Sequence, residues 1–376
     1  MHITSLPISY RPGRPFRIAT TAFVVAALAR ITGSKHVLSV NSSSLRDKLP
    51  IADDVLLRTY REDMSKLGTY PAGLEFHDKD PGFLGFVSDS IQRMLATKQC
   101  GRKAMEILHC SCGKVESPKE VLEQVLAQNR SDFVRERNGT FYCKLCDSPL
   151  SQTTQEAFFH ENFRPGDANV LPHALSGRSS SLVAEITSRP VIFSRHARPS
   201  GFVVEEKMID PDFCWMHQIA YLHELTGESE FCLVAGRDSM TEAVKVALFT
   251  EMHYPHIKMK IVIHPLLQFP ESSPVNKKTT ILELVQLCGD SSRAKTLLAA
   301  SLQWSRHYSM VPTDEIDIIE KSLRNDPVRR DAHGTDCTIE EAIGILKRDS
   351  VIKLLKALRQ KRELQTNESK LFDALS

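Results

Sequence analysis

The 376-residue sequence is short of several features, and each shortage excludes a class of protein. Its longest apolar run, AFVVAALA at 22–29, falls far below the roughly 20 residues that a helix needs to cross a bilayer. The formal net charge is only +2, so nucleic acid would have to bind a local basic patch. With 41% hydrophobic and 25% charged residues, the chain has a globular composition, and its length predicts roughly two or three packed units. We expect no contact with a membrane.

Acidic side chains are absent from the first 46 residues, whereas six basic ones occur there: Arg11, Arg14, Arg17, Arg30, Lys35 and Arg46. Two interpretations stay open. A stretch that is basic and free of acidic residues is typical of an organellar transit peptide. Alternatively, the stretch forms the first strand and helix of the fold, and its basic side chains face an anion.

Nine cysteines are present, an odd number, and no convincing signal peptide precedes them. This usage argues against a disulfide framework and for a reducing compartment. We therefore expect a cytoplasmic protein, with an organelle as the alternative if the basic N-terminus is cleaved.

Four of the cysteines cluster in the sequence. Cys110 and Cys112 form a C-x-C, and Cys143 and Cys146 form a C-x-x-C in GTFYCKLCDSPL. Between the pairs, SPKEVLEQVLAQ predicts a short helix that begins with a capping box and a proline. Thiolates at these spacings favour a tetrahedral zinc site, and four protein ligands leave no open position, so the metal would be structural. The alternative is two solvent-facing pairs of reduced thiols.

The elements on both sides of this module predict an α/β fold. ATTAFVVAALARITG, residues 19–33, has a helical apolar stripe and a glycine stop, and the strand-like KHVLSV follows it. EFCLVAG and KIVIH read as two further strands, separated by the helical DSMTEAVKVALFTEMH. We expect a split Rossmann-like parallel sheet in which the turn before the first helix faces the ligand.

After about residue 290 the sequence is helical in pattern. Thr338 and Glu341 form a capping box, and the segment that follows has an apolar stripe and many basic residues. This C-terminal helical tail would contact an RNA backbone or a protein partner. The predicted organisation is a first half of the Rossmann-like domain at 1–98, a zinc-binding insertion at 99–165, a second half at 166–290 and a helical domain at 291–376.

The order of these features resembles the class I aminoacyl-tRNA synthetases, most closely the glutamyl/glutaminyl branch and its short relatives without an anticodon-binding domain. YRPGRPFRIATTAFVVAALARITGSKHVLSV lies where the family has its HIGH-type signature, and PVNKKTTILEL where it has the KMSKS-type loop. The C-x-C with the later Tyr142-Cys143 resembles the zinc motif of the acceptor-binding insertion, and RPVIFSRHARPSGF its arginine-rich strand. The HIGH positions, however, read Phe-Arg-Ile-Ala at 16–19, without histidine or glycine.

The resemblance implies an ATP site. Arg17 and Lys277 would act on the phosphates as catalytic residues, and Lys277 matches the family's second signature lysine. The nucleotide would be held by five further residues: Thr20, Thr21, Gly236, Asp238 and Lys278. The competing interpretations are a helix-capping role for the threonines and for Asp238, and plain solvation for the two lysines.

The resemblance also implies a substrate pocket. Trp215, His217 and Tyr221 would line it, and Arg195 would bind a carboxylate or the phosphates of an RNA end. Core packing is the alternative for the three former residues, because Trp215 fits the apolar face of a helix, and a solvated loop is the alternative for Arg195.

Two functions follow. The first is an ATP-dependent ligase that activates an amino acid and transfers it to a tRNA or another acceptor. The second is a scaffold that lost catalysis and binds RNA or a protein. The missing HIGH residues favour the scaffold, whereas the cysteine module, Asp238 and Lys277 favour retained recognition of ATP or an aminoacyl-adenylate.

Overall fold

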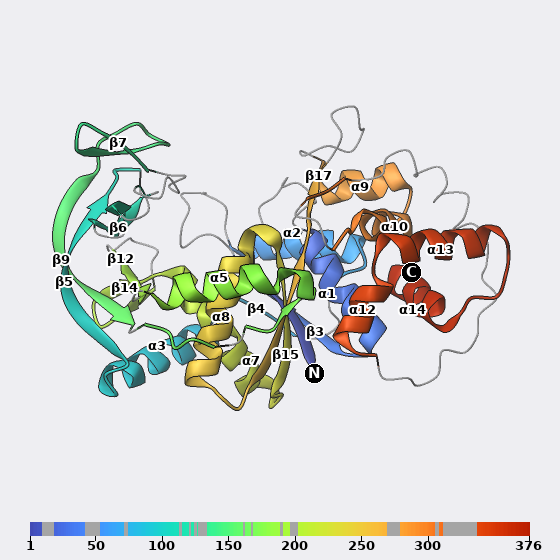
Figure 1. Ribbon diagram of the computed structural model, residues 1–376, viewed down its shortest axis with the longest axis horizontal. Coiled ribbons are helices and arrows are strands. Elements are labelled where there is room, and N and C mark those ends of the chain that lie inside the picture. Colours follow the sequence, from blue (N-terminus) through green and yellow to red (C-terminus); the bar gives the residue numbers. More distant parts are fainter. Residues whose placement is uncertain are drawn as a thin grey trace. The chain divides into compact units, whose positions relative to one another are not determined.

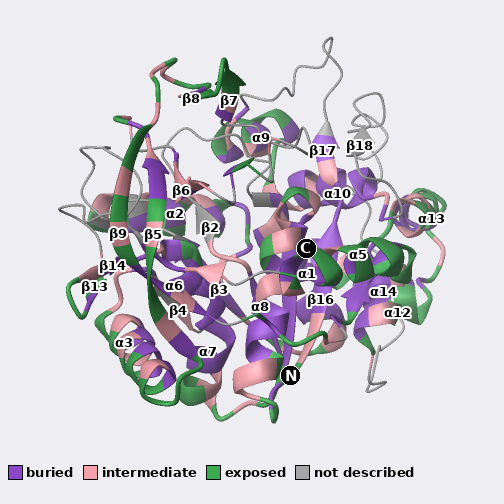
Figure 2. Ribbon diagram, turned by 60° about the vertical axis from the view of Figure 1, so that its left-hand side comes forward, coloured by how far each residue is buried: buried purple, intermediate pink, exposed green. Residues whose placement is uncertain are grey.

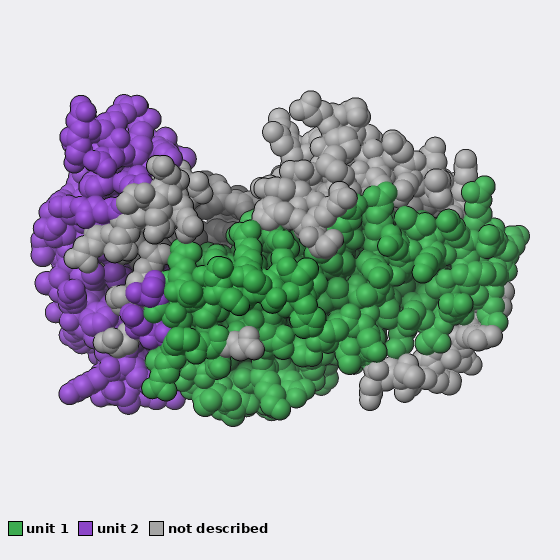
Figure 3. All heavy atoms as spheres, in the orientation of Figure 1, with its two compact units in different colours: residues 1–84, 164–187, 215–376 green, residues 85–163, 188–214 purple. Residues whose placement is uncertain are grey.

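The computed structural model divides the chain into two compact units, which Figure 3 colours separately. The first holds residues 1–84, 164–187 and 215–376, and the second holds residues 85–163 and 188–214. The structure describes residues 1–9, 19–41, 53–70, 74–112, 115–119, 122, 123, 126, 134–160, 162–166, 168–188, 191–195, 202–268, 279–304, 308–310 and 337–376. None of the helices in these ranges combines the length and apolar character that crossing a bilayer requires.

A parallel sheet forms the centre of the first unit. Its order is β10-β16-β15-β1-β3-β2, and β4 also pairs with β3. The strands are β1 (His2–Ser5), β2 (Ile8–Ser9), β3 (Lys35–Asn41), β4 (Glu75–His77), β10 (Val170–Leu171), β15 (Glu230–Gly236) and β16 (Lys258–His264). β1 pairs directly with β15, His2 opposite Phe231 and Ser5 opposite Val234. The early and late segments therefore share one sheet.

The two crossover connections lead to opposite sides of the central β1–β15 pair. α1 (Ala19–Thr32) leads from β1 to β3, and α8 (Met240–His253) leads from β15 to β16 on the other side of β1. Because parallel crossovers are right-handed, α1 and α8 cover opposite faces of the sheet (Figure 1). The strand order thus reverses between β1 and β15, which is where open α/β sheets bind ligands.

Burial explains the composition of α1. The apolar run at 22–29 is at most 6% exposed at every residue, because α1 lies between the sheet and the C-terminal helices (Figure 2). A helix that is apolar all round needs such cover on both sides. The covering helices are α10 (Ser291–Ser301), α12 (Ile339–Ile345) and α14 (Thr366–Leu375), and α13 (Arg348–Arg359) packs against α10 and α14. A helical C-terminal part is therefore confirmed, as is the capping box of Thr338 and Glu341.

Several elements differ from the sequence prediction. The single helical stretch expected after Thr338 is broken between Ile345 and Arg348, and α14 was not predicted. Part of the helical pattern after residue 290, TDEIDIIEKSL at 313–323, lies outside the described residues. The remaining elements of the first unit are α2 (Asp53–Lys66), the start of α3 (Pro81–Ala96), η2 (His173–Leu175), α5 (Ser176–Thr187), α7 (Gln218–Thr226), η3 (Arg237–Ser239), β17 (Leu266–Gln268), α9 (Ile281–Cys288) and β18 (Tyr308–Met310).

The second unit is built on the long hairpin of β5 (Cys100–His109) and β9 (Ser151–His160). β6 (Glu116–Pro118) pairs with β5, so Ser117 and Pro118 lie in a strand and not in the predicted helical cap. The edge of β5 offers these residues a ladder, and an edge strand tolerates proline. The described residues that follow are helical as expected: Lys119, Leu122, Glu123 and Leu126. The other strands are β7 (Val134–Arg137), β8 (Thr140–Cys143), β11 (Val191–Ile192), β12 (Ser194–Arg195), β13 (Val203–Val204) and β14 (Lys207–Ile209). α6 (Pro211–Met216) begins at the end of this unit.

The two leucines of α9 provide a matched test of this packing. Leu284 is fully buried in the core, whereas Leu287 on the same helix is 50% exposed. Leu284→Ala should lower the free energy of unfolding by about 2–5 kcal/mol, because it leaves a cavity. Leu287→Ala should change it by less than about 0.5 kcal/mol. Urea unfolding followed by circular dichroism measures both, and equal losses would contradict the assigned burial.

Candidate functional site

Two neighbouring strands place polar groups at the carboxyl edge of the sheet. β15 ends at Gly236 and β16 ends at His264, and these two residues are paired in register. α1 begins close by in the fold, at the carboxyl end of β1. The helix start and both strand ends therefore meet beside the position where the strand order reverses.

His264 is the centre of this edge. Its Nε2 lies 2.9 Å from Thr21 Oγ1, and its Nδ1 lies 3.0 Å from the carbonyl oxygen of Pro265. Burial lowers the pKa of His264, so the ring is neutral near pH 7. Because a carbonyl only accepts, Nδ1 carries the proton and Nε2 accepts from the Thr21 hydroxyl. The residue was not predicted as functional, and its only sequence signal is a histidine that ends the apolar strand KIVIH.

Gly236 and Asp238 lie against the same histidine. A Cβ added to Gly236 would lie 2.8 Å from Asp238 Oδ1 and 3.5 Å from His264 Cε1. The absence of a side chain thus lets the carboxylate of Asp238 fold over the end of β15. Asp238 belongs to η3, and the N-cap residue of α8 is Ser239, which makes no side-chain capping bond.

Unpartnered donors accompany these groups. Thr20 is 1% exposed, and its Oγ1 has no hydrogen-bond partner within the described part of the chain. Arg237 Nε and Nη1 are also buried and, among the described residues, without a partner. Burial lowers the pKa of Arg237, and the positive charge of Arg178 lowers it further. A buried donor without a partner is costly, so such groups favour a ligand that accepts hydrogen bonds.

The three predicted pocket residues lie among aromatic side chains. Trp215 and Tyr221 both contact Phe83, with ring centroids 5.2 and 5.3 Å apart, and the Tyr221 hydroxyl lies 3.3 Å from Asp80 Oδ1. His217 lies apart from them on Phe249, at 4.5 Å. All three are buried, at 3%, 7% and 0% exposure for Trp215, Tyr221 and His217.

The other predicted residues cannot be placed in the site by their side chains. Arg17, Lys277 and Lys278 lie outside the described residues. Arg195 pairs with Met208 through the backbone of β12 and β14, and its side chain is outside the description. The predicted nucleotide residues that the structure brings together are therefore Thr21, Gly236 and Asp238.

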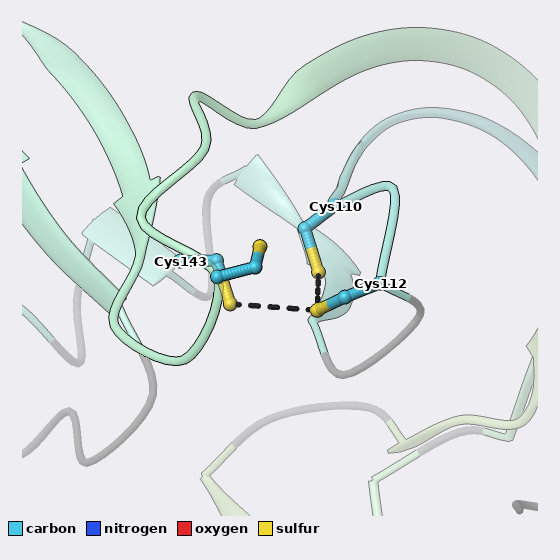
Figure 4. A group of neighbouring side chains, drawn as sticks. Cys110, Cys112 and Cys143 are labelled. Carbon is cyan, nitrogen blue, oxygen red and sulfur yellow. Dashed lines mark hydrogen bonds between the residues drawn. The ribbon is translucent and has the colours of Figure 1, made fainter.

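The four clustered cysteines form a second site, in the other unit. The Sγ atoms of Cys110, Cys112, Cys143 and Cys146 all lie within 4.8 Å of one another. Cys112 and Cys143 are 3.7 Å apart, close to the roughly 3.8 Å expected for two thiolates on one tetrahedral zinc. Cys110 and Cys112 are 2.9 Å apart, too far for a disulfide. Figure 4 shows the three sulfurs of Cys110, Cys112 and Cys143 turned toward one another.

The local backbone explains this convergence. β7 and β8 form a hairpin whose two-residue turn is Asn138-Gly139, with φ of 52° and 76°. Beyond β8, the amide of Cys143 donates to Ser148 O, and the amide of Asp147 donates to Cys143 O. A hydrogen bond from the backbone of Ser148 is the main cause that lowers the pKa of Cys146 to about 6, and the neighbouring thiols contribute. A thiol that ionises easily suits a divalent metal. The cluster could hold a metal ion.

Comparison with known proteins places the fold. No protein-family model and no curated protein sequence matches the chain. Solved structures of Mycobacterium tuberculosis methionyl-tRNA synthetase do match along the whole chain. Two complexes with methionyl-adenylate have TM-scores of 0.63 and 0.60 at 11% identity, covering 87% and 88% of those chains. The free form has a TM-score of 0.59 at 12% identity and 85% coverage.

These neighbours give no support to the glutamyl/glutaminyl branch, to which the sequence motifs had pointed. The motifs behind that resemblance are short and eroded, so they do not fix a branch. The fold of this chain is similar to the fold of these methionyl-tRNA synthetase structures.

Proposed function

We propose that the chain binds an adenine nucleotide, either ATP or an aminoacyl-adenylate, at the carboxyl edge of β15 and β16. We call this position the adenylate site. The observation that carries this proposal is the joining of Thr21, Gly236, Asp238 and His264 at the point where the strand order reverses. The methionyl-tRNA synthetase structures of similar fold include complexes with methionyl-adenylate. Methionine is therefore the first amino acid to test.

Each group has a role that fits an adenylate. The Asp238 carboxylate accepts hydrogen bonds and suits ribose hydroxyls, and Gly236 leaves room for the ligand to approach the backbone. The unpartnered nitrogens of Arg237 suit a phosphate or a carboxylate. Arg17, Lys277 and Lys278 would add positive charge for the phosphates, as the sequence predicts. Trp215, His217, Tyr221 and Arg195 stay the proposed residues for the amino acid.

The two functions differ in whether the protein transfers the activated amino acid from the bound adenylate to an acceptor. The ligase would pass the activated amino acid to a tRNA acceptor end. The second candidate is a scaffold that binds the ligand or RNA without catalysis, and the loss of histidine and glycine at 16–19 favours it. A protein partner would bind the C-terminal helices.

For the cysteine cluster we propose a structural zinc ion. The four thiols suit zinc, and they would complete its tetrahedral shell, so the ion would take no part in chemistry. Its contribution would be to hold the β7–β8 hairpin against the C-x-C turn, in a core whose described part holds six buried apolar residues.

Glycine substitutions test the adenylate site. Gly236→Ala should weaken binding of a non-hydrolysable methionyl-adenylate analogue at least about tenfold, because the new Cβ displaces the Asp238 carboxylate. Gly344→Ala is the matched control, since a Cβ there meets nothing within 4 Å. Isothermal titration calorimetry measures both affinities. Unchanged affinity in Gly236→Ala would exclude the proposed site.

ATP–pyrophosphate exchange separates the two functions. The assay uses methionine first and then other amino acids, with and without total tRNA. Exchange that Lys277→Ala abolishes supports the ligase. Binding of the analogue without exchange under any of these conditions supports the scaffold.

Metal analysis tests the zinc site. The purified protein should contain about one zinc per chain. Cys143→Ser should lose that zinc and lower the melting temperature. Cys100→Ser, which changes a buried cysteine of the same unit outside the cluster, should retain it. Full zinc occupancy in Cys143→Ser, measured by mass spectrometry, would rule out this ligand set.

A further inference from the structure

A pair of histidines lies at the opposite, amino edge of the same sheet. His223 belongs to α7, and His256 belongs to the turn between α8 and β16. Their Nε2 atoms are 3.3 Å apart, and their rings meet edge to face, with centroids 4.8 Å apart and planes at 63°. The nearby strands β15 and β16 run away from this pair toward Gly236 and His264, so the pair is separate from the adenylate site.

The distance between the two nitrogens fits a shared metal ion. Two imidazole nitrogens that bind one tetrahedral ion at about 2.0–2.1 Å lie about 3.3–3.4 Å from each other. Imidazole is a preferred ligand of zinc, nickel and copper.

The backbone fixes the ligand atom of His223. Its Nδ1 lies 2.7 Å from the carbonyl oxygen of Glu228, which only accepts. Nδ1 therefore carries the proton and Nε2 presents a lone pair toward His256. This second hydrogen bond is the one that metal-binding histidines commonly make, because it fixes the tautomer and the orientation of the ring.

The helix end that carries His223 and the turn that carries His256 are both held in place by the backbone. Gly227, at φ +68°, ends α7 and turns the chain so that Glu228 lies beside His223, and the amide of Gly227 donates to His223 O. The amide of Lys258 donates to Ser229 O at 2.8 Å, which ties the turn of His256 to the loop after α7. The two nitrogens are therefore positioned before any ion arrives, which reduces the entropy cost of binding.

Exposure makes the site accessible. His256 is exposed and His223 is half-buried, so an ion can reach both nitrogens and keep water on its remaining positions. We propose that His223 and His256 bind a divalent transition-metal ion, of the zinc, nickel or copper class, through their Nε2 atoms. The ion would join α7 to the turn before β16 and would not take part in adenylate chemistry.

Nickel is the probe that tests this site. Untagged protein, with its cysteine cluster loaded with zinc, is titrated with nickel chloride by isothermal titration calorimetry. We expect one saturable nickel site per chain, and at least about tenfold weaker binding in His256→Gln. His256 is the better position to change, because its side chain is exposed. His223→Gln should show the same loss.

The control is His173→Gln, which removes another exposed histidine of the same unit and should leave nickel binding unchanged. Nickel should also raise the melting temperature of the wild type and of His173→Gln, but not that of His256→Gln. The absence of a saturable site, or equal affinity in His256→Gln, would overturn the proposal.

Discussion

The pairing of β1 with β15 is the constraint on which the rest of the first unit depends. These strands are more than 220 residues apart in the sequence, and every backbone bond between them closes a long loop. The pairing sets the reversal of strand order, and the reversal puts the ends of β15 and β16 beside the start of α1. Without it, Thr21 and His264 would not meet, and the adenylate proposal would have no geometry.

Burial and polarity are divided along the length of these strands. Their middles are apolar and covered on both faces, as a parallel sheet requires. The proposed sites lie at their ends: Gly236 and His264 at the carboxyl edge, and His223 of α7 with His256 of the turn before β16 at the amino edge. The same pair of strands therefore holds two proposed sites about 20 Å apart, one for an adenylate and one for a metal.

The stability of the cysteine module has a different origin from that of the parallel sheet. The described part of its core holds six buried apolar residues, two of which are Cys110 and Cys143 themselves. A metal bound by the thiols would add to the stability of the module, because it would join two segments that are distant in the sequence. The Asn-Gly hairpin turn between β7 and β8 brings the second pair of thiols toward the first.

The sequence by itself determined the local elements and the ligand types. The apolar run of α1, the strands EFCLVAG and KIVIH and the capping box at Thr338 could be predicted because each depends on neighbouring residues. The C-x-C and C-x-x-C spacings predicted the cysteine cluster as a ligand set, because each pair by itself has the spacing of a metal-binding motif.

Only the tertiary structure decided which distant groups meet. His264, the pairing of His223 with His256, and the strand pairing of Ser117 and Pro118 with β5 all depend on contacts between separate segments. The helix propensity of SPKEVLEQVLAQ could not reveal that β5 offers its first residues a ladder. The local sequence pattern carries no information about which strand edge or side chain lies nearby in space. Contacts between distant segments therefore determined the proposed sites at both edges of the sheet.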